Sequence, residues 1–261
     1  MSYAGPMPGT LPLRQYDLVI CDIDGCLVSE GQESFDVEAL SKVAAYNRLA
    51  VERGDRPLIT LCTGRPQPFA EAVCRLIGNV HVPCVCEMGV WLYDPGTNEY
   101  EMDPGITGGD LSAVRALSAW CEQEWGRGVG GGVSQQPGKN ASVTLWHRDT
   151  AYLRTLVPRV EGKCREMGWP FRVSMTWFYI NCDLRHVSKG TGLDRLSARL
   201  RIPRERLAGI GDTASDKCIA ERVGFFACPS NAAAAIKEHA HYVAKGAEAV
   251  GVVEILERLV G

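Results

Sequence analysis

The sequence lacks the features that mark several common classes of protein. It has no excess of basic residues, because 28 Lys and Arg stand against 31 Asp and Glu, a formal net charge of −3. Nucleic acids and anionic membranes attract an excess of positive charge, so we expect neither as a partner. No apolar run approaches the roughly 20 residues of a membrane-spanning helix, and the first residues lack the pattern of a signal peptide. We therefore expect a soluble, cytoplasmic protein.

Cysteine pairs typical of structural zinc sites are also missing. The chain has 11 cysteines without a Cys-x-x-Cys pair, and the nearest spacing is Cys84 with Cys86. The odd count and the positions of Cys21 and Cys62 inside apolar runs are typical of reduced, buried thiols. We therefore expect a reducing compartment and no structural zinc.

Length and composition are those of a globular protein. At about 150 residues per domain, 261 residues predict one large domain or a pair. A hydrophobic fraction of 46% and a charged fraction of 23% are enough for a sizeable core. Residues 1–15 hold three prolines and two glycines and are predicted to form a loose arm, and the periodic sequence begins at Asp17.

Strand-like and helix-like segments alternate in the first third of the chain. Short apolar runs predict strands at Leu18 to Cys21, Pro57 to Thr63 and Val82 to Cys86. Helical patterns lie between them, at Asp36 to Arg53 and from Gly64 to Ile77. This alternation predicts a parallel sheet of right-handed βαβ units, with the chemistry beyond the carboxyl ends of its strands.

The middle of the chain has a different pattern. All six tryptophans lie between positions 91 and 177, and Phe171 to Asn181 alternates like an antiparallel strand. After Lys189 the parallel alternation resumes, with a strand predicted at Leu207 to Ile210. We predict an α/β core formed by residues 1–88 and 185–261, interrupted by an α+β cap domain of residues 89–184.

Six residues with reactive side chains fall at the ends of predicted elements. Asp22 and Asp24 close the first strand and Thr63 the second, and this set is completed by Lys189, Asp212 and Asp216. These residue types suit phosphoryl transfer, in which a protein positions phosphorus for in-line attack and neutralises charge.

The paired aspartates suit two steps of that reaction. An aspartate can attack phosphorus as a nucleophile, which splits one difficult step into two. An aspartate two residues later projects to the same side and can act as general acid and then as general base. A hard divalent cation, usually Mg²⁺, suits such a site, because the carboxylates would otherwise repel a phosphate.

The chain resembles the haloacid dehalogenase superfamily in four motifs that occur in the family's order. They are Asp22-Ile23-Asp24-Gly25-Cys26-Leu27, Thr63-Gly64-Arg65, Lys189-Gly190 and Gly211-Asp212-Thr213-Ala214-Ser215-Asp216. The long insertion between the second and third motifs resembles the C2-type cap of the Cof-like phosphatases. The resemblance covers the chain from Tyr16 onward and implies a doubly wound, parallel, Rossmann-like core with an inserted C2-type cap.

The resemblance also implies roles for the motif residues. Asp22 would be the nucleophile and Asp24 the general acid and base. Mg²⁺ would bind Asp22, the backbone carbonyl of Asp24 and Asp212, while Asp216 would orient Lys189 or a metal-bound water. The phosphoryl group would bind Thr63, Gly64, Arg65 and Lys189. The chain departs from the family's usual residues at Cys26, which replaces Thr, and at Ser215, where Cof-like members often have Asn.

Two shorter stretches resemble a narrower group within this superfamily. Cys86 to Val90 and Ala227 to Ala232 are similar to the matching parts of small archaeal-type phosphoglycolate phosphatases. Sucrose-phosphate and mannosyl-3-phosphoglycerate phosphatases share the architecture, so the substrate stays open between a sugar phosphate and a phosphoglycolate-like acid.

The predicted function is Mg²⁺-dependent hydrolysis of a phosphate monoester of a small metabolite through an aspartyl-phosphate. A phosphomutase of the phosphomannomutase type and a catalytically inactive binding protein remain alternatives. Free phosphate as the product would distinguish the hydrolase from the mutase. The sequence does not predict the oligomeric state.

Overall fold

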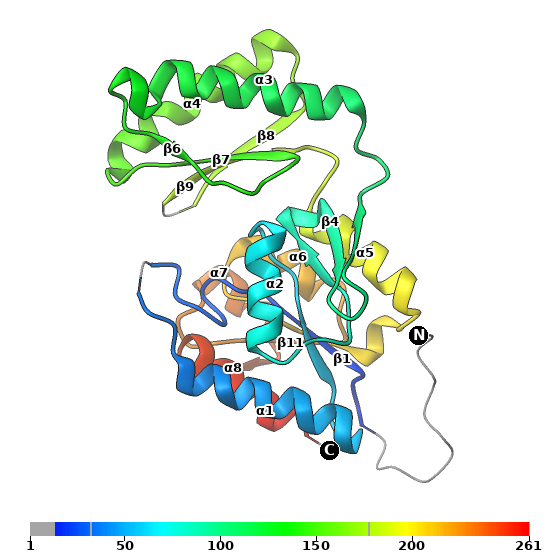
Figure 1. Cartoon of the computed structure of the whole chain (residues 1–261). Coiled ribbons are helices and arrows are strands. Elements are labelled where there is room, and N and C mark those ends of the chain that lie inside the picture. Colours follow the sequence, from blue (N-terminus) through cyan, green and yellow to red (C-terminus); the bar gives the residue numbers. More distant parts are fainter. Residues whose placement is uncertain (1–13, 32, 177, 261) are drawn as a thin grey trace. The chain divides into compact units, whose positions relative to one another are not determined.

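A computed structural model describes residues 14–31, 33–176 and 178–260 of the chain (Figure 1). Of the arm predicted over residues 1–15, all but Arg14 and Gln15 lies outside the described residues. The chain divides into two compact units, the first formed by the residues up to Thr60, Arg75–Asn79 and those from Ile202 onward. The second unit is formed by Leu61–Cys74 and Val80–Arg201.

The first unit is built on a five-stranded sheet. Its strands are β1 (Leu18–Cys21), β2 (Leu58–Leu61), β10 (Leu207–Ile210), β11 (Phe225–Cys228) and β12 (Tyr242–Val243). They lie in the order β12-β11-β10-β1-β2, and the pairs β1 with β10, β10 with β11 and β11 with β12 are parallel. Every residue of β1, β2 and β10 is buried, as expected for strands covered on both faces. The predicted parallel α/β core is confirmed.

The longest helix of this unit is α1 (Val37–Arg53), which confirms the helix predicted there. Asp36 caps its start by accepting a hydrogen bond from Ala39 N at 2.9 Å, and Gly54 ends it in a left-handed conformation. It packs against α8 (Glu248–Arg258), and the two lie side by side in Figure 1. The shorter helical segments are α6 (Lys217–Ala220), α7 (Ala234–Lys237), η3 (Arg204–Arg206) and η4 (Ala214–Asp216).

The second unit holds two antiparallel sheets. The smaller has the order β3-β4-β5, and the larger has the order β6-β7-β9-β8. The strands are β3 (Cys84–Cys86), β4 (Trp91–Asp94), β5 (Glu99–Met102), β6 (Ser134–Gln135), β7 (Ser142–Trp146), β8 (Phe171–Met175) and β9 (Tyr179–Leu184). The helical segments are η1 (Glu87–Gly89), α3 (Gly108–Trp125), η2 (Arg127–Val129), α4 (Thr150–Met167) and α5 (Lys189–Leu200), and α2 (Gln67–Leu76) crosses the boundary between the units.

The larger sheet and two long helices form the core of this second unit. Helices α3 and α4 lie on one side of the four-stranded sheet (Figure 1). The buried cluster between them is apolar and comes from β7, β9 and both helices; it includes Val143, Leu145, Ile180, Cys182, Leu117, Leu153, Leu156 and Val160. The predicted α+β character of this part of the chain is confirmed, while the boundaries at residues 89 and 184 stay a prediction.

Two predictions about strands were wrong. Val82 to Cys86 was expected in the parallel sheet; the structure has a strand there, β3, but its ladder is antiparallel, with β4. Its parallel contacts with the segment after β2 are a bridge between Cys62 and Val85 and a hydrogen bond from Thr63 N to Val85 O at 2.9 Å. Phe171 to Asn181 was expected as one strand, but it forms the antiparallel hairpin of β8 and β9. The sequence between those strands has no glycine, proline or asparagine to signal a turn.

Two further observations concern the described residues as a whole. All 11 cysteines lie among them and each is a free thiol, with ten of them buried. No helix in the described part of the chain is long and apolar enough to cross a membrane.

Candidate active site

The turn after β1 positions the first two predicted site residues. Asp22 is buried, and its Oδ1 accepts a hydrogen bond from the backbone N–H of Ile23 at 2.8 Å. The chain then folds back sharply, because Gly25 N donates to Val28 O at 2.7 Å and Gly25 has a φ of 74°. Asp24 lies in this turn and is half-buried. The turn therefore fixes Asp22 at the carboxyl end of β1 by a bond to one of its carboxylate oxygens.

The segment after β10 supplies two more carboxylates. Asp216 Oδ2 accepts hydrogen bonds from the backbone N–H groups of Asp212 and Thr213, each at 3.1 Å, and from the Thr213 hydroxyl at 3.2 Å. Both aspartates are buried. Because Asp216 satisfies two backbone donors in its own turn, it fixes the path of the chain at Asp212.

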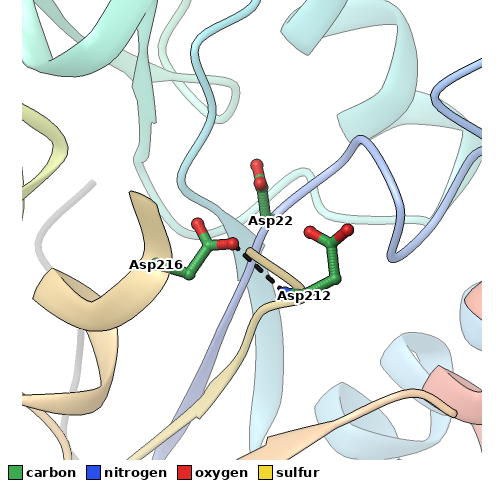
Figure 2. Close-up of side chains that lie close together, drawn as sticks. All are labelled: Asp22, Asp212 and Asp216. Atoms are coloured by element: carbon green, nitrogen blue, oxygen red, sulfur yellow. Dashed lines mark hydrogen bonds between the residues drawn. The ribbon is translucent and has the colours of Figure 1, made fainter. Parts of the chain in front are cut away.

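Three carboxylates meet at this end of the sheet. One oxygen from each of Asp22, Asp212 and Asp216 lies within 4.8 Å of the other two. Figure 2 shows the side chains reaching the same place from the end of β1, from the segment after β10 and from η4. The strand order reverses between β1 and β10, since β2 lies beyond one and β11 and β12 beyond the other. Ligands of open parallel sheets bind at such a switch point, beyond the carboxyl ends of the strands.

Close backbone packing shapes the cluster. A Cβ at Gly25 would lie 1.9 Å from Asp212 Oδ2, so position 25 has no room for a side chain. The carbonyl of Gly25 accepts a hydrogen bond from Asn231 Nδ2 at 2.8 Å, and the carbonyl of Asp212 accepts one from Ala233 N at 2.8 Å. Asn231 Oδ1 in turn accepts a bond from Glu248 N at 2.7 Å. The loop after β11 therefore joins the two aspartate-bearing segments.

The donor set fits a hard divalent cation. Three buried carboxylates within 4.8 Å of one another carry like charges that repel in a region of low dielectric. A divalent cation bound by carboxylate oxygens removes that repulsion, and Mg²⁺ binds through one or two carboxylates together with substrate phosphate oxygens. Burial raises the pKa of the nearby Cys26 thiol well above its ordinary value, so this thiol adds no further negative charge to the cluster.

The second predicted motif forms one turn of the second unit. Thr63 is fully buried, its N–H donates to Val85 O at 2.9 Å, and its hydroxyl accepts from Arg65 N at 3.0 Å. The Arg65 guanidinium lies over the rings of Phe69, at 4.9 Å, and Tyr179, at 5.9 Å. Hydrogen bonds therefore hold Thr63, which precedes Gly64, and ring contacts hold the side chain of Arg65, which follows it.

Lys189 begins α5 in the same unit. Ser188 caps this helix by accepting a hydrogen bond from Thr191 N at 3.1 Å, and Thr191 Oγ1 accepts one from Ser188 N. Lys189 is buried and is the first residue of α5, whose N-terminus carries the positive end of the helix dipole. A helix N-terminus of this kind suits a phosphate group.

The structure brings together some of the predicted residues. Asp22, Asp212 and Asp216 meet, whereas the side chain of Asp24 is not one of the three clustered carboxylates. Thr63, Gly64 and Arg65 share one turn, and Lys189 starts a helix of the same unit. Their joint action with the aspartates stays a prediction. Asp216, expected to orient Lys189 or a water, also holds the backbone of Asp212.

Two residues at the site have structural roles that were not predicted from the sequence. Asn231 supports the Gly25 turn, and Glu87 supports the Thr63 turn through its backbone N–H, which donates to Arg65 O at 2.8 Å. Both lie in stretches whose similarity to small phosphatases was visible. Their side chains were not assigned because most of their partners are backbone groups distant in the sequence, and a local sequence pattern does not show such contacts.

Comparison with known proteins gives concordant matches. Residues 135–256 match a family described as haloacid dehalogenase-like hydrolase. The chain is 32% identical to the phosphoglycolate phosphatase of Methanosarcina mazei over 248 residues, which cover 94% of this chain and 97% of that protein. A stretch of 93 residues is 44% identical to the phosphoglycolate phosphatase of Methanothrix thermoacetophila and covers 36% of this chain and 42% of that one. A solved structure from Thermoplasma acidophilum shares the fold, with a TM-score of 0.71, 16% identity, and coverage of 94% of this chain and 98% of that one.

Proposed function

Since this chain belongs to the haloacid dehalogenase-like hydrolases and is a phosphoric monoester hydrolase, we propose that it is a Mg²⁺-dependent phosphatase acting through an aspartyl-phosphate on Asp22. The observation that carries the proposal is the meeting of Asp22, Asp212 and Asp216 at the carboxyl ends of β1 and β10. A divalent cation bound among them would account for three buried acidic groups that face one another.

The cation is proposed to bind Asp22, Asp212 and the backbone carbonyl of Asp24. It would neutralise negative charge on the carboxylates and on the phosphate during the reaction. Asp216 holds the Asp212 backbone in place through its own hydrogen bond and so contributes to the site by positioning.

Asp22 is proposed to attack phosphorus in line with the leaving oxygen. A bond forms between a carboxylate oxygen of Asp22 and phosphorus, and the bond from phosphorus to the substrate oxygen breaks. Asp24 donates its proton to that leaving oxygen. In the second step Asp24 takes a proton from water, the water oxygen attacks phosphorus, and the bond to Asp22 breaks to release inorganic phosphate.

The phosphoryl group is proposed to bind Thr63, Gly64, Arg65 and Lys189. Thr63 offers a buried hydroxyl, its turn offers backbone N–H groups, and Lys189 is a cationic residue that begins a helix; groups of these kinds bind phosphate oxygens in proteins. This assignment follows the motif resemblance.

The substrate is proposed to be a small phosphorylated hydroxy acid of the phosphoglycolate type. The support is the name that two relatives share, one of them matched along 97% of its length.

A phosphate-release screen tests the proposal. The purified protein is incubated with Mg²⁺ and a panel containing phosphoglycolate, phosphoglycerates, sugar phosphates and p-nitrophenyl phosphate, with Asp22→Asn as the blank. We expect free phosphate from at least one small phosphomonoester and the highest kcat/KM with phosphoglycolate. Isomerised sugar phosphate without phosphate release would identify a mutase instead, and no turnover of any compound would refute the proposal.

A further inference from the structure

The short segment Glu87–Gly89 has an unusual backbone. All three residues have a left-handed conformation, with φ values of 48° at Glu87, 56° at Met88 and 101° at Gly89. This conformation is strained for residues other than glycine, and it persists only where surrounding contacts hold it. Strain of this kind often marks a place that function requires.

The turn supports the Thr63 loop by backbone contacts. Glu87 N donates a hydrogen bond to Arg65 O at 2.8 Å, and Met88 N donates one to Thr63 O at 3.0 Å. The Met88 side chain lies against Gly64, where a Cβ would come within 3.1 Å of its sulfur. The turn therefore fixes the carbonyls of Thr63 and Arg65, the first and last residues of the loop proposed to bind phosphate.

The same turn packs against the start of α5. A Cβ at Gly89 would lie 2.1 Å from the carbonyl oxygen of Ser188, so the two backbones are in direct contact. Ser188 immediately precedes Lys189, the other residue proposed to bind the phosphoryl group. One turn therefore touches both elements that would hold the phosphate.

The Glu87 carboxylate fixes the turn to the start of β7. Its Oε1 accepts three hydrogen bonds, from Asn140 N at 2.8 Å, Ala141 N at 2.8 Å and the Ser142 hydroxyl at 3.0 Å. The residue is completely buried. Burial raises the pKa of Glu87 above its ordinary value, although the three donors and the charge of Lys139 act in the opposite direction. A buried carboxylate with three donors on one oxygen is a specific contact that few other side chains could replace.

We propose that Glu87 is a positioning residue for phosphate binding, holding the strained turn so that the Thr63 loop and the N-terminus of α5 keep their places. The inference rests on the proposed phosphatase function and extends it to a residue outside the four motifs. Small displacements of groups that bind a reacting phosphate lower the reaction rate strongly. A buried carboxylate such as Glu87 can prevent such displacements by holding the supporting turn in one position.

The test compares Glu87→Ala and Glu87→Gln with a destabilising control. The control is Leu156→Ala, which removes a buried side chain of α4 in the apolar cluster of the same unit. For each variant, kcat and KM for p-nitrophenyl phosphate, the inhibition constant of inorganic phosphate, the half-saturating Mg²⁺ concentration and Tm are measured.

We expect Glu87→Ala to lower kcat/KM about 10- to 100-fold and to raise the inhibition constant of phosphate. The half-saturating Mg²⁺ concentration should stay unchanged, because the cluster of Asp22, Asp212 and Asp216 comes from other segments. Glu87→Gln should keep more activity than Glu87→Ala, since its amide oxygen can still accept from part of the three donors. Leu156→Ala should lower Tm while leaving kcat/KM and phosphate inhibition at wild-type values.

The results distinguish failure of this inference from failure of the proposed phosphatase function. A folded Glu87→Ala with wild-type kcat/KM and phosphate inhibition overturns the inference, as does a loss that Leu156→Ala reproduces. Absence of turnover in the wild type refutes the proposed function instead. Where Glu87→Ala does not fold, Ser142→Ala removes one of the three donors; a several-fold loss of kcat/KM supports the inference, and an unchanged value overturns it.

Discussion

Asp216 Oδ2 accepts a hydrogen bond from the backbone N–H of Asp212 at 3.1 Å, so one carboxylate of the cluster fixes the chain that carries another (Figure 2). Asp216 also accepts from Thr213 N at the same distance. Asp212 and Asp216 are thus joined by a hydrogen bond as well as being two of the three acidic groups of the cluster.

Removal of the Asp216 carboxylate should weaken cation binding at Asp212. Asp216→Ala leaves the N–H groups of Asp212 and Thr213 without their shared acceptor, and the Asp212 side chain then loses its fixed direction. We expect the half-saturating Mg²⁺ concentration to rise about 10- to 100-fold, measured from activity against Mg²⁺ concentration. Asp216→Asn keeps an oxygen acceptor and should show a smaller rise. Equal Mg²⁺ dependence in Asp216→Ala and the wild type would contradict this role.

A side chain at position 25 should disrupt the cluster. The Cβ of Gly25→Ala would fall 1.9 Å from Asp212 Oδ2, and the φ of 74° disfavours any residue other than glycine. We expect a lower Tm and weaker Mg²⁺ activation. Gly162→Ala is the matched control, because it lies inside α4 with no atom within 4 Å of the added Cβ. That control should gain about 0.5 to 1 kcal/mol of stability. Equal Tm shifts in the two variants would show that the contact with Asp212 has no consequence.

An ion pair beside β1 and β10 should make stability depend on pH. Arg206 Nε and Nη2 donate to the two oxygens of Asp17 at 2.9 and 2.7 Å, and Arg14 Nε adds a third bond at 2.9 Å. Burial raises the pKa of Asp17, but the hydrogen bonds from Arg206 and Arg14 outweigh it and lower this pKa below the ordinary value. The pair therefore stabilises the fold above the unfolded pKa of Asp, near 4, and loses its effect as pH falls through the lower folded pKa.

Asp17→Asn tests this linkage. We expect the free energy of unfolding to fall by about 1 kcal/mol at pH 7, and the difference from the wild type to shrink as the pH is lowered below about 4. Glu38→Gln is the control, because its pair with Lys42 at 3.1 Å is highly exposed; its effect should stay below about 0.5 kcal/mol. A pH-independent difference for Asp17→Asn would contradict the assignment of the shift to Arg206 and Arg14.

Local patterns in the sequence were sufficient for much of the core. Apolar runs located β1 and β10, and the polar residues that follow them, Asp22 and Asp212, come together as the parallel order requires. Periodicity could not choose the partner of β3, because an apolar strand suits a parallel or an antiparallel neighbour equally well. The turn between β8 and β9 was missed because its residues carry no turn signal.

The supporting residues of the site were beyond the reach of local patterns. Glu87 binds backbone groups at Asn140 and Ala141, and Asn231 binds the backbone of Gly25. Such contacts use groups that every residue possesses, so the sequence of the partner segment contains no sign of them. They become visible only when the fold brings the segments together.

The central claim is that Asp22 is the nucleophile of a Mg²⁺-dependent phosphatase. The most direct measurement is the rate of inorganic phosphate release from phosphoglycolate and p-nitrophenyl phosphate by the wild type and by Asp22→Asn, at saturating Mg²⁺. Thermal unfolding of both proteins shows whether the variant is folded; we expect it to be, because the substitution preserves shape and removes one of three mutually repelling charges. The account predicts that Asp22→Asn releases phosphate at least about a thousandfold more slowly than the wild type. Phosphate release by a folded Asp22→Asn within about tenfold of the wild-type rate would contradict it.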